Sequence, residues 1–257
     1  MWSGDEQFWG KRSPVLFPIV GTLKNNTYFF KGSSFNLPRH GFARDKNFIL
    51  KSQTSNSLLF TLNSDDSTLA VYPFPFQLSI LYIINSASLS VTYIVHNTGD
   101  GTMYFSVGGH PAFKVPQFLH ESYEDYALVF NKKGNVGRWP ITPEGLIAAE
   151  PVPFLNNTDT IHLKKDLFQK DAIVFKHMAL ESVKLLSLKS GKGIRFNFGG
   201  FPYLGIWAAK NANFICIEPW CGIADSEHSD QLLENKEGIN RLDPGSLWQR
   251  TWSVTIL

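Results

Sequence analysis

One histidine of the chain stands where its ring could exchange a proton with a ligand. An apolar run leads into Gly108 and Gly109, then His110, and Pro111 follows. A proline restricts the residue before it to extended conformations, so the direction of His110 is well defined, and the two glycines clear space beside it. The pattern fits a general acid at a strand end, and it also fits a turn that contains a hydrogen-bonded histidine.

A second histidine, His40, precedes Gly41 and lies four residues before Arg44 in the segment 38–45. Glycine permits a close approach of the backbone to a ligand, and both imidazole and guanidinium groups can donate to ligand oxygens. One interpretation of the segment is the edge of a pocket. The other is a surface loop in which Arg44 pairs with Asp45 or another acid.

Two acidic residues lie beside apolar runs. Glu218 follows the strand-like stretch 214–217 and precedes Pro219 and Trp220. Burial there would raise the pKa of its carboxyl group, and a neighbouring cation would lower it. Glu218 is therefore a candidate catalytic base beside an aromatic sugar platform, or one half of a salt bridge at a strand end. Asp171 could bind a pair of hydroxyl groups, although aspartate is also common in turns.

Other residue combinations do not form a recognisable site. Cys216 and Cys221 flank Glu218 without a second cysteine pair, so we predict no zinc site, and a polar loop explains the acids and the histidine at 225–228. No serine lies in a nucleophile-elbow motif, and no glycine-rich phosphate loop is present. These residue combinations therefore point to no zinc site and to no phosphate loop.

The elements that must position these residues are β-strands. Residues 88–97 alternate, with Leu89, Val91 and Tyr93 on one side and polar residues mostly on the other. Further strands are predicted at 58–62, 77–85, 103–107, 183–188, 193–198, 203–209, 214–218 and 252–257. Only residues 117–126 and 230–236 suggest short helices. The pattern predicts an all-β fold, one large antiparallel β-sandwich with few short helices.

Composition excludes several classes of protein. The 24 basic and 22 acidic residues nearly balance, without a Lys/Arg run, so no nucleic-acid partner is expected. No apolar stretch is long enough to span a membrane, and the first residues do not resemble a signal peptide. Two cysteines are too few for a disulfide scaffold, which favours the cytoplasm. The 36 aromatic residues (21 Phe, 8 Tyr, 7 Trp) suit a sandwich core, and such rings also stack on sugars.

Five stretches, taken together and in order along the chain, resemble the aldose 1-epimerase (galactose mutarotase-like) family, and more closely its shorter bacterial LacX-type branch. They are residues 13–21, 40–45, 109–113, 201–207 and 217–220. The resemblance implies a β-supersandwich, a sugar-binding groove on one sheet, and no cofactor. Family members usually begin with further strands, so we expect one domain over 1–257 that lacks them, and their absence would bare a sheet edge.

The resemblance also assigns roles to residues by position. His110 matches the general acid that protonates the ring oxygen, and Glu218 matches the general base that takes the proton of the anomeric hydroxyl. His40 matches the histidine that helps to hold the ring. The matches to substrate-binding residues are Arg44, Arg12 and Asp171.

The implied reaction opens the hemiacetal, rotates the C1–C2 bond and closes the ring on the other face. A histidine and a carboxylate on opposite sides of the ligand could do this, and a nearby cation or hydrogen-bond donor should keep Glu218 ionised. The implied substrate is a hexose. A hexose 6-phosphate, which Arg12, Arg39 and Arg44 leave open, a non-catalytic sugar-binding protein and a structural β domain remain alternatives, and the sequence is silent on the oligomeric state.

Overall fold

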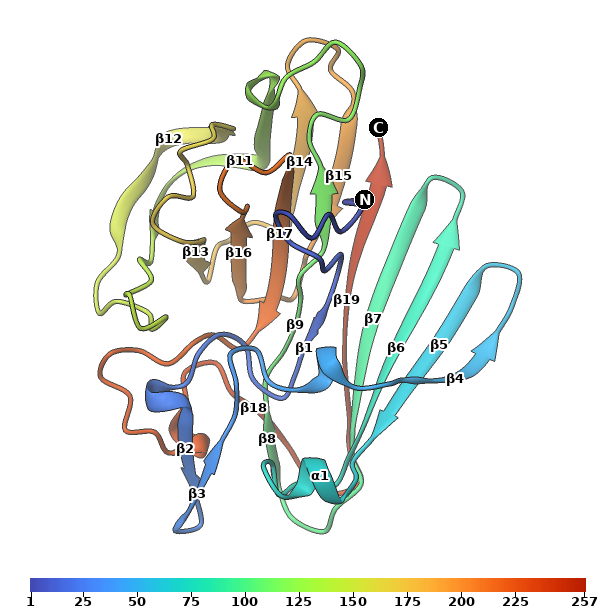
Figure 1. The fold of residues 1–257 in the computed structure, drawn as a ribbon, viewed down its shortest axis with the longest axis vertical. Helices are drawn as coiled ribbons and strands as arrows, with labels where there is room; N and C mark the ends of the chain where they lie inside the picture. The colour runs from blue at the N-terminus through green and yellow to red at the C-terminus, as the bar shows by residue number, and fades with distance from the viewer.

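The computed structural model describes residues 1–257 and is built on two large antiparallel sheets (Figure 1). The larger sheet has nine strands in the order β12-β11-β14-β15-β19-β7-β6-β5-β4. Its strands are β4 (Ile49–Gln53), β5 (Ser57–Asn63), β6 (Phe76–Asn85), β7 (Ser88–Asn97), β11 (Tyr126–Arg138), β12 (Val152–His162), β14 (Ser182–Ser187), β15 (Gly193–Asn197) and β19 (Leu247–Ile256).

The smaller sheet has six strands and carries most of the segments singled out in the sequence. Its order is β1-β9-β17-β16-β13, and β10 pairs with β17 beyond the end of β9. Its strands are β1 (Val15–Leu16), β9 (Val107–Gly109), β10 (Ala112–Lys114), β13 (Ile173–Lys176), β16 (Tyr203–Trp207) and β17 (Phe214–Cys221).

Minor elements connect the two sheets. Two small ladders join β2 (Thr27–Phe30) with β3 (Ser33–Asn36) and β8 (Met103–Phe105) with β18 (Asn240–Leu242). The helices are α1 (Asp66–Leu69) and the 3-10 turns η1 (Lys24–Asn26), η2 (Ala43–Asp45), η3 (Tyr123–Asp125) and η4 (Leu233–Asn235). None of these helices has the length and apolar character needed to cross a membrane.

The predicted all-β sandwich is confirmed, and β7 occupies the predicted 88–97. The helix expected at 117–126 is wrong, because only η3 forms there and Tyr126 already begins β11. Two of the longest strands, β11 and β12, were not predicted. The expected strand at 103–107 is divided into β8 and β9 at Ser106.

Aromatic side chains fill the space between the sheets. Phe113 of β10 meets Phe196 of β15 with ring centroids 5.9 Å apart, and Phe130 of β11 meets Phe175 of β13 at 6.0 Å. These residues belong to one core cluster of 45 buried side chains, so both sheets share a single hydrophobic core.

At Gly109, the backbone of the smaller sheet lies close to side chains of the larger sheet. A Cβ atom at this position would lie 2.6 Å from the Tyr93 hydroxyl and 3.0 Å from Trp252 Nε1. Those two groups are buried and are bonded to each other, because Trp252 Nε1 donates to the Tyr93 hydroxyl at 3.0 Å. Gly109 is therefore needed for the sheet spacing, and it directly precedes His110.

We predict that Gly109→Ala lowers the free energy of unfolding by about 1–3 kcal/mol, because the added methyl group overpacks this contact. Urea unfolding of the purified protein measures the change. Gly101→Ala is the matched control: nothing lies within 4 Å of the place that its methyl group would take, so stability should change by less than about 1 kcal/mol. Equal stability of the two variants would contradict the close-approach argument.

Candidate active site

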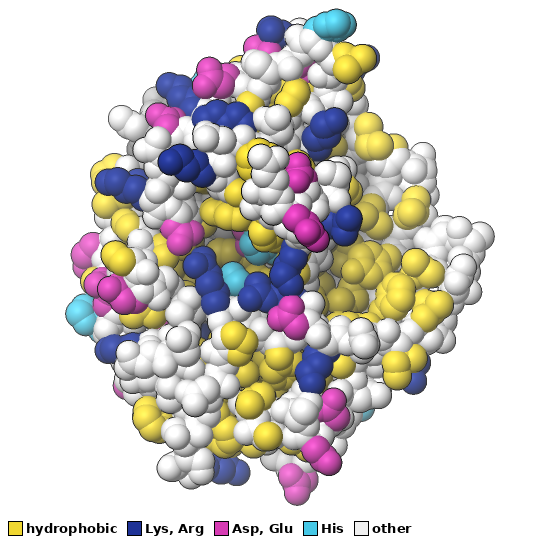
Figure 2. Space-filling model, viewed as in Figure 1, with side chains coloured by type: hydrophobic (Ala, Val, Ile, Leu, Met, Phe, Trp, Pro, Cys, Tyr) yellow, Lys and Arg dark blue, Asp and Glu magenta, His cyan; other side chains and the backbone are white.

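A groove of about 760 Å³ opens on the smaller sheet, within the size range of small-molecule sites. Basic side chains surround two histidines at its mouth (Figure 2). Five of the six residues singled out in the sequence line this groove, namely His40, Arg44, His110, Asp171 and Glu218. The sixth, Arg12, is exposed beside Gly4 and does not line it.

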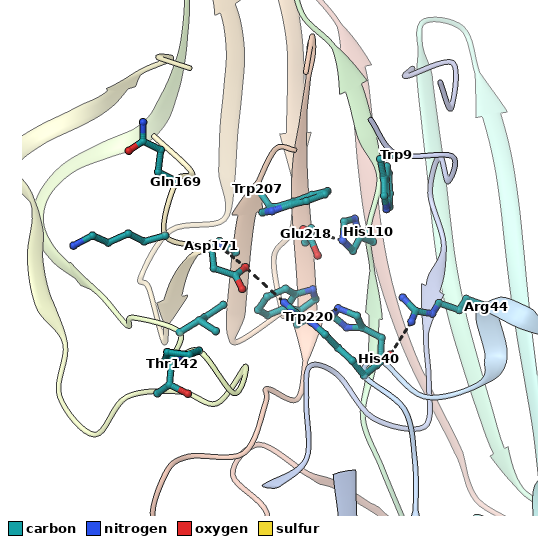
Figure 3. A pocket seen from close by; sticks show the side chains of 15 residues that line it. Trp9, His40, Arg44, His110, Thr142, Gln169, Asp171, Trp207, Glu218 and Trp220 are labelled. Carbon is teal, nitrogen blue, oxygen red and sulfur yellow. Dashed lines mark hydrogen bonds and ion pairs between the residues drawn. The ribbon is translucent and has the colours of Figure 1, made fainter. Parts of the chain in front are cut away.

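Strand register places His110 directly across from Glu218. Ala112 pairs with Cys216 and Gly108 pairs with Trp220, so the interrupted position between them, His110, faces Glu218 on β17. Directly opposed residues project their side chains to the same side of a sheet. His110 Nε2 and Glu218 Oε1 lie 3.3 Å apart at the floor of the groove (Figure 3).

This contact corrects the expected placement of the pair on opposite sides of a ligand. The ring oxygen and the anomeric hydroxyl of a sugar are both bonded to C1. Two groups that must reach both oxygens at once can therefore be neighbours on one side of C1, and a contact of 3.3 Å satisfies that condition.

Burial sets the protonation of the pair. Glu218 is 2% exposed, and burial raises the pKa of its carboxyl group well above its usual value, although the charge of Arg39 opposes that shift. Burial also lowers the pKa of His110 to about 3. Burial therefore favours the neutral form of each group, and the charge of Arg39 acts in the direction that the sequence predicts for a cation near Glu218.

Hydrogen bonding favours one neutral tautomer of His40. The backbone N–H of Gly21 donates to His40 Nδ1 at 3.1 Å, which places the ring proton on Nε2. Arg39 Nε lies 3.4 Å from Nε2, and because both nitrogens then carry protons this longer contact is not a hydrogen bond. Burial lowers the pKa of His40 well below its usual value, and the charges of the neighbouring arginines act in the same direction. His40 therefore offers an N–H donor at the groove wall and carries no charge.

The arginines bridge the rim of the groove. Arg39 lies 3.6 Å from Asp171 on the facing segment, and Arg44 donates to the Arg39 carbonyl at 2.9 Å (Figure 3). Arg44 Nε also lies 3.7 Å from an Asp45 carboxylate oxygen, so the loop lines the groove and pairs Arg44 with Asp45. This Nε is buried and makes no hydrogen bond. The sequence pointed to Arg39 only as a candidate phosphate contact.

Three tryptophans make the apolar surfaces of the groove. Trp9 stacks on His110 with ring centroids 4.8 Å apart, and Trp207 meets the same imidazole edge-on at 5.8 Å. Trp220, the aromatic platform expected from the sequence, also lines the groove. Trp9 and Trp207 had no assigned role: Trp207 only ended the stretch 201–207, and only the abundance of aromatic residues pointed to Trp9. Flat apolar surfaces beside polar donors suit a sugar, which has both kinds of face.

One group of side chains has the types that bind a metal. Ligand atoms of His110, Cys216 and Glu218 lie within 4.8 Å of one another. Burial, and then the charge of Glu218, raise the pKa of the Cys216 thiol well above its usual value, which disfavours the thiolate that metals bind. Cys221 faces the other side of β17, where its Sγ lies 4.0 Å from the Gly200 carbonyl, so the two cysteines do not share a site.

Comparison with known proteins agrees with this architecture. The family model described as aldose 1-epimerase matches residues 1–237. The chromosomal protein LacX of Lactococcus lactis subsp. lactis is 34% identical over 269 residues, which cover 100% of this chain and 89% of that protein.

Solved structures agree as well. A galactose mutarotase related enzyme from Lactobacillus acidophilus superimposes with a TM-score of 0.95 at 35% identity, over 100% of this chain and 86% of that one. A galactose mutarotase-like protein from Lactobacillus casei gives 0.92 at 28% identity, over 100% and 88%.

We predict that His110 makes the protein acid-sensitive. Its pKa is about 3 when folded and 6.5 when unfolded, so below pH 6.5 the unfolded state binds the extra proton. Stability that is complete above pH 6.5 is then lost by up to about 1.4 kcal/mol per pH unit as the pH falls toward 3. His110→Asn should reduce that slope in urea unfolding between pH 6.5 and 4.

The raised pKa of Glu218 acts in the opposite direction: its contribution is present at low pH and is lost as the pH rises through the folded pKa. It is common to the wild-type protein and the His110→Asn variant, and it cannot produce the predicted difference in slope unless the two groups titrate together. Equal slopes for the two proteins would contradict a buried, uncharged His110.

Proposed function

Because the chain belongs to the aldose 1-epimerase family, we propose that it is a mutarotase that interconverts the α and β anomers of a hexose. The observation that carries this proposal is the buried contact of His110 with Glu218, 3.3 Å long, at the floor of a groove walled by tryptophans and rimmed by arginines. Ring opening requires an acid and a base that both reach C1, since one oxygen of C1 gains a proton while the other loses one, and a side-by-side pair can do this.

In the proposed reaction, His110 protonates the ring oxygen and Glu218 removes the proton of the anomeric hydroxyl. The C1–O5 bond breaks and C1 becomes the carbonyl carbon of the open-chain aldose. Rotation about C1–C2 presents the other face of the carbonyl, and the two residues exchange roles for closure. The pair then holds the same single proton as before, so no further reactant is needed.

The reactive form has the proton on His110 and the charge on Glu218, whereas burial favours the proton on the carboxyl group. The two forms differ by one proton transfer across the 3.3 Å contact. A bound sugar stabilises the charged form, because its anomeric hydroxyl donates to the carboxylate and its ring oxygen accepts from the imidazolium. Arg39 adds a positive charge that favours the same state.

The rim residues bind the sugar in this proposal. His40 donates from Nε2, and Arg44, which lines the groove, donates from its guanidinium group. Asp171 accepts from a pair of hydroxyl groups once its contact with Arg39 rearranges. Arg12 receives no role, because it lies outside the groove. A non-catalytic sugar-binding protein is the weaker alternative, since binding alone does not require an acid and a base to be buried against each other.

A phosphorylated hexose is the second candidate substrate. Arg39, Arg44 and Lys170 all line the groove, while Asp171 is the only acid at its rim and is already near Arg39. An excess of cations at the mouth would favour a dianionic phosphate over a free hydroxymethyl group.

We predict that Glu218→Gln and His110→Asn each reduce the rate of anomer exchange by about 10²–10⁴-fold, because each removes one proton-transferring group. Polarimetry of freshly dissolved α-glucose or α-galactose follows the exchange, with the uncatalysed rate subtracted. Folded wild-type protein that accelerates no free aldose and no aldose 6-phosphate would contradict the proposed enzyme.

We further predict that Lys170→Met raises the KM for a hexose 6-phosphate about tenfold and leaves the KM for the free hexose nearly unchanged, since a lost phosphate contact is worth roughly 1.5 kcal/mol. Lys164→Met, an exposed lysine outside the groove, is the matched control. An equal effect of Lys170→Met on both substrates would exclude phosphate recognition by this residue.

A further inference from the structure

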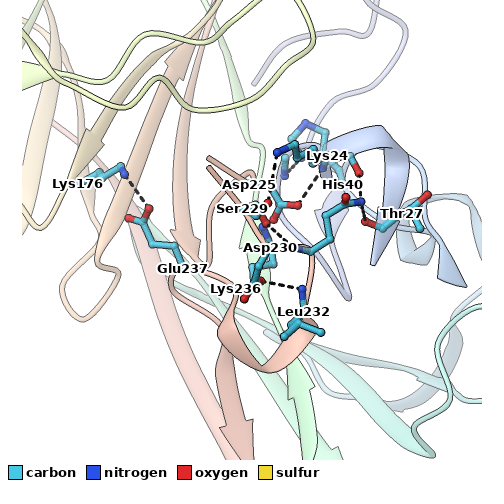
Figure 4. Close-up of polar contacts among 12 residues, drawn as sticks. Lys24, Thr27, His40, Lys176, Asp225, Ser229, Asp230, Leu232, Lys236 and Glu237 are labelled. Carbon is cyan, nitrogen blue, oxygen red and sulfur yellow. Dashed lines mark hydrogen bonds and ion pairs between the residues drawn. The ribbon is translucent and has the colours of Figure 1, made fainter. Parts of the chain in front are cut away.

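A buried carboxylate outside the groove joins the loops that form its rim. Asp225 and Lys236 form an ion pair of 2.6 Å, and each side chain is only 2% exposed (Figure 4). Neither residue lines the groove. A buried ion pair is weak evidence of added stability, because both charges lose their hydration, but its directional bonds can fix one arrangement of the surrounding segments.

The first segment joined to Asp225 holds His40. Asp225 Oδ2 accepts from the backbone N–H of Lys24 at 2.9 Å, and its own N–H donates to the Thr22 carbonyl at 2.9 Å. Gly21, the next residue back, donates to His40 Nδ1 and accepts from the His40 N–H at 2.8 Å. The position and the tautomer of His40 thus depend on the 21–24 segment.

Gly21 also contacts the segment that leads from β17 to Asp225. It has a φ of 74°, and a Cβ atom there would lie 2.4 Å from the Cβ of Ala224. The 21–24 segment and residues 224–225 are therefore in direct backbone contact. Only Thr22 and Gly21 lie between Asp225 and the His40 ring along these hydrogen bonds, so a displacement of Asp225 would move His40.

The second segment joined to Asp225 is the opposite lip of the groove, residues 141–147. The Asp225 carbonyl accepts from the N–H of Ile147 at 2.8 Å. Ile147 forms a bridge with Ile141, and the N–H of Thr142 donates to the Leu146 carbonyl at 2.8 Å. Ile141 and Thr142 line the groove across from His40. Asp225 therefore hydrogen-bonds both to the 21–24 segment, which holds His40, and to the 141–147 lip.

We propose that Asp225 is a positioning residue, which fixes His40 and the 141–147 lip relative to each other and so sets the affinity of the groove for its sugar. The inference rests on the proposed function where it concerns sugar affinity, and on the observed contacts where it concerns His40. Lys236 compensates the buried charge, so both carboxylate oxygens are satisfied and the Lys24 contact is held in one geometry.

A pair of variants at Lys24 tests this without disturbing the ion pair. Lys24→Pro removes two things: the N–H that donates to Asp225, and the lysine side chain. Leu23 before it is already extended (φ −85°, ψ 146°), which is the conformation that a following proline requires. Lys24→Ala is the matched control, since it removes the same side chain, which bonds to Glu227 and Ser229, and keeps the N–H.

A second pair of variants removes both buried charges together. In Asp225→Leu with Lys236→Met, no acceptor remains for the Lys24 N–H. In Asp225→Asn with Lys236→Met, the amide oxygen can still accept it. The second protein keeps the proposed positioning bond without the ion pair, so the comparison separates the bond from the charge. Urea unfolding establishes that each protein is folded.

We expect two proteins, Lys24→Pro and the double variant with Asp225→Leu, to raise the KM for the sugar about tenfold with kcat changed less than about threefold. The reason is that the rim binds the sugar while His110 and Glu218 transfer protons. Lys24→Ala and the double variant with Asp225→Asn should stay within about threefold of wild type in both constants. The inference is overturned if Lys24→Pro matches Lys24→Ala, or if kcat falls while KM is unchanged.

An NMR measurement distinguishes failure of this inference from failure of the proposed function. In ¹⁵N spectra of the histidine rings, wild-type His40 should show one neutral tautomer with the proton on Nε2. Lys24→Pro should mix the two tautomers, and Lys24→Ala should not. A wild-type protein without mutarotase activity would refute the function alone, whereas an unchanged His40 tautomer in Lys24→Pro would refute the positioning role.

Discussion

The contact of His110 with Glu218 is the interaction around which the site is organised. It exists because β9 and β10 both pair with β17 in the same register, on either side of His110. Gly109 lets this strand lie against Tyr93 and Trp252 of the larger sheet, so the floor of the groove is backed by the shared core. An acid–base pair supported in this way has little freedom to move, which is the condition for efficient proton transfer.

Burial makes the same contact chemically useful. Both groups are nearly inaccessible to water, so burial raises the pKa of the Glu218 carboxyl group and lowers that of His110. Trp9 covers the imidazole on one face, and Arg39 supplies a positive charge nearby. The floor of the groove thus carries the reactivity, while the loops of the rim carry the polar groups that distinguish one ligand from another.

The sequence predicted the class of fold and many strands, because period-two alternation is local and strong in segments such as 88–97. It failed where pairing with distant strands decides the structure. β12 contains Pro153 and a run of turn-forming residues, which an edge strand tolerates and a pattern search interprets as a loop. In the stretch 117–126, Phe118 and Leu119 are exposed, and Tyr126 instead begins β11 and pairs with Ser187 of β14, so a distant strand decides the conformation.

For the site, the sequence by itself determined which groups are present: two histidines beside glycines, a glutamate at the end of an apolar run, and two arginines close to His40. Local spacing restricts the direction of a side chain such as His110 before its proline, but it does not measure distances between residues a hundred positions apart. Only the tertiary structure decided that His110 touches Glu218, that Arg12 lies outside the groove and that Trp9 lies within it. Those outcomes depend on strand register and on burial by distant segments, and both are properties of the folded chain.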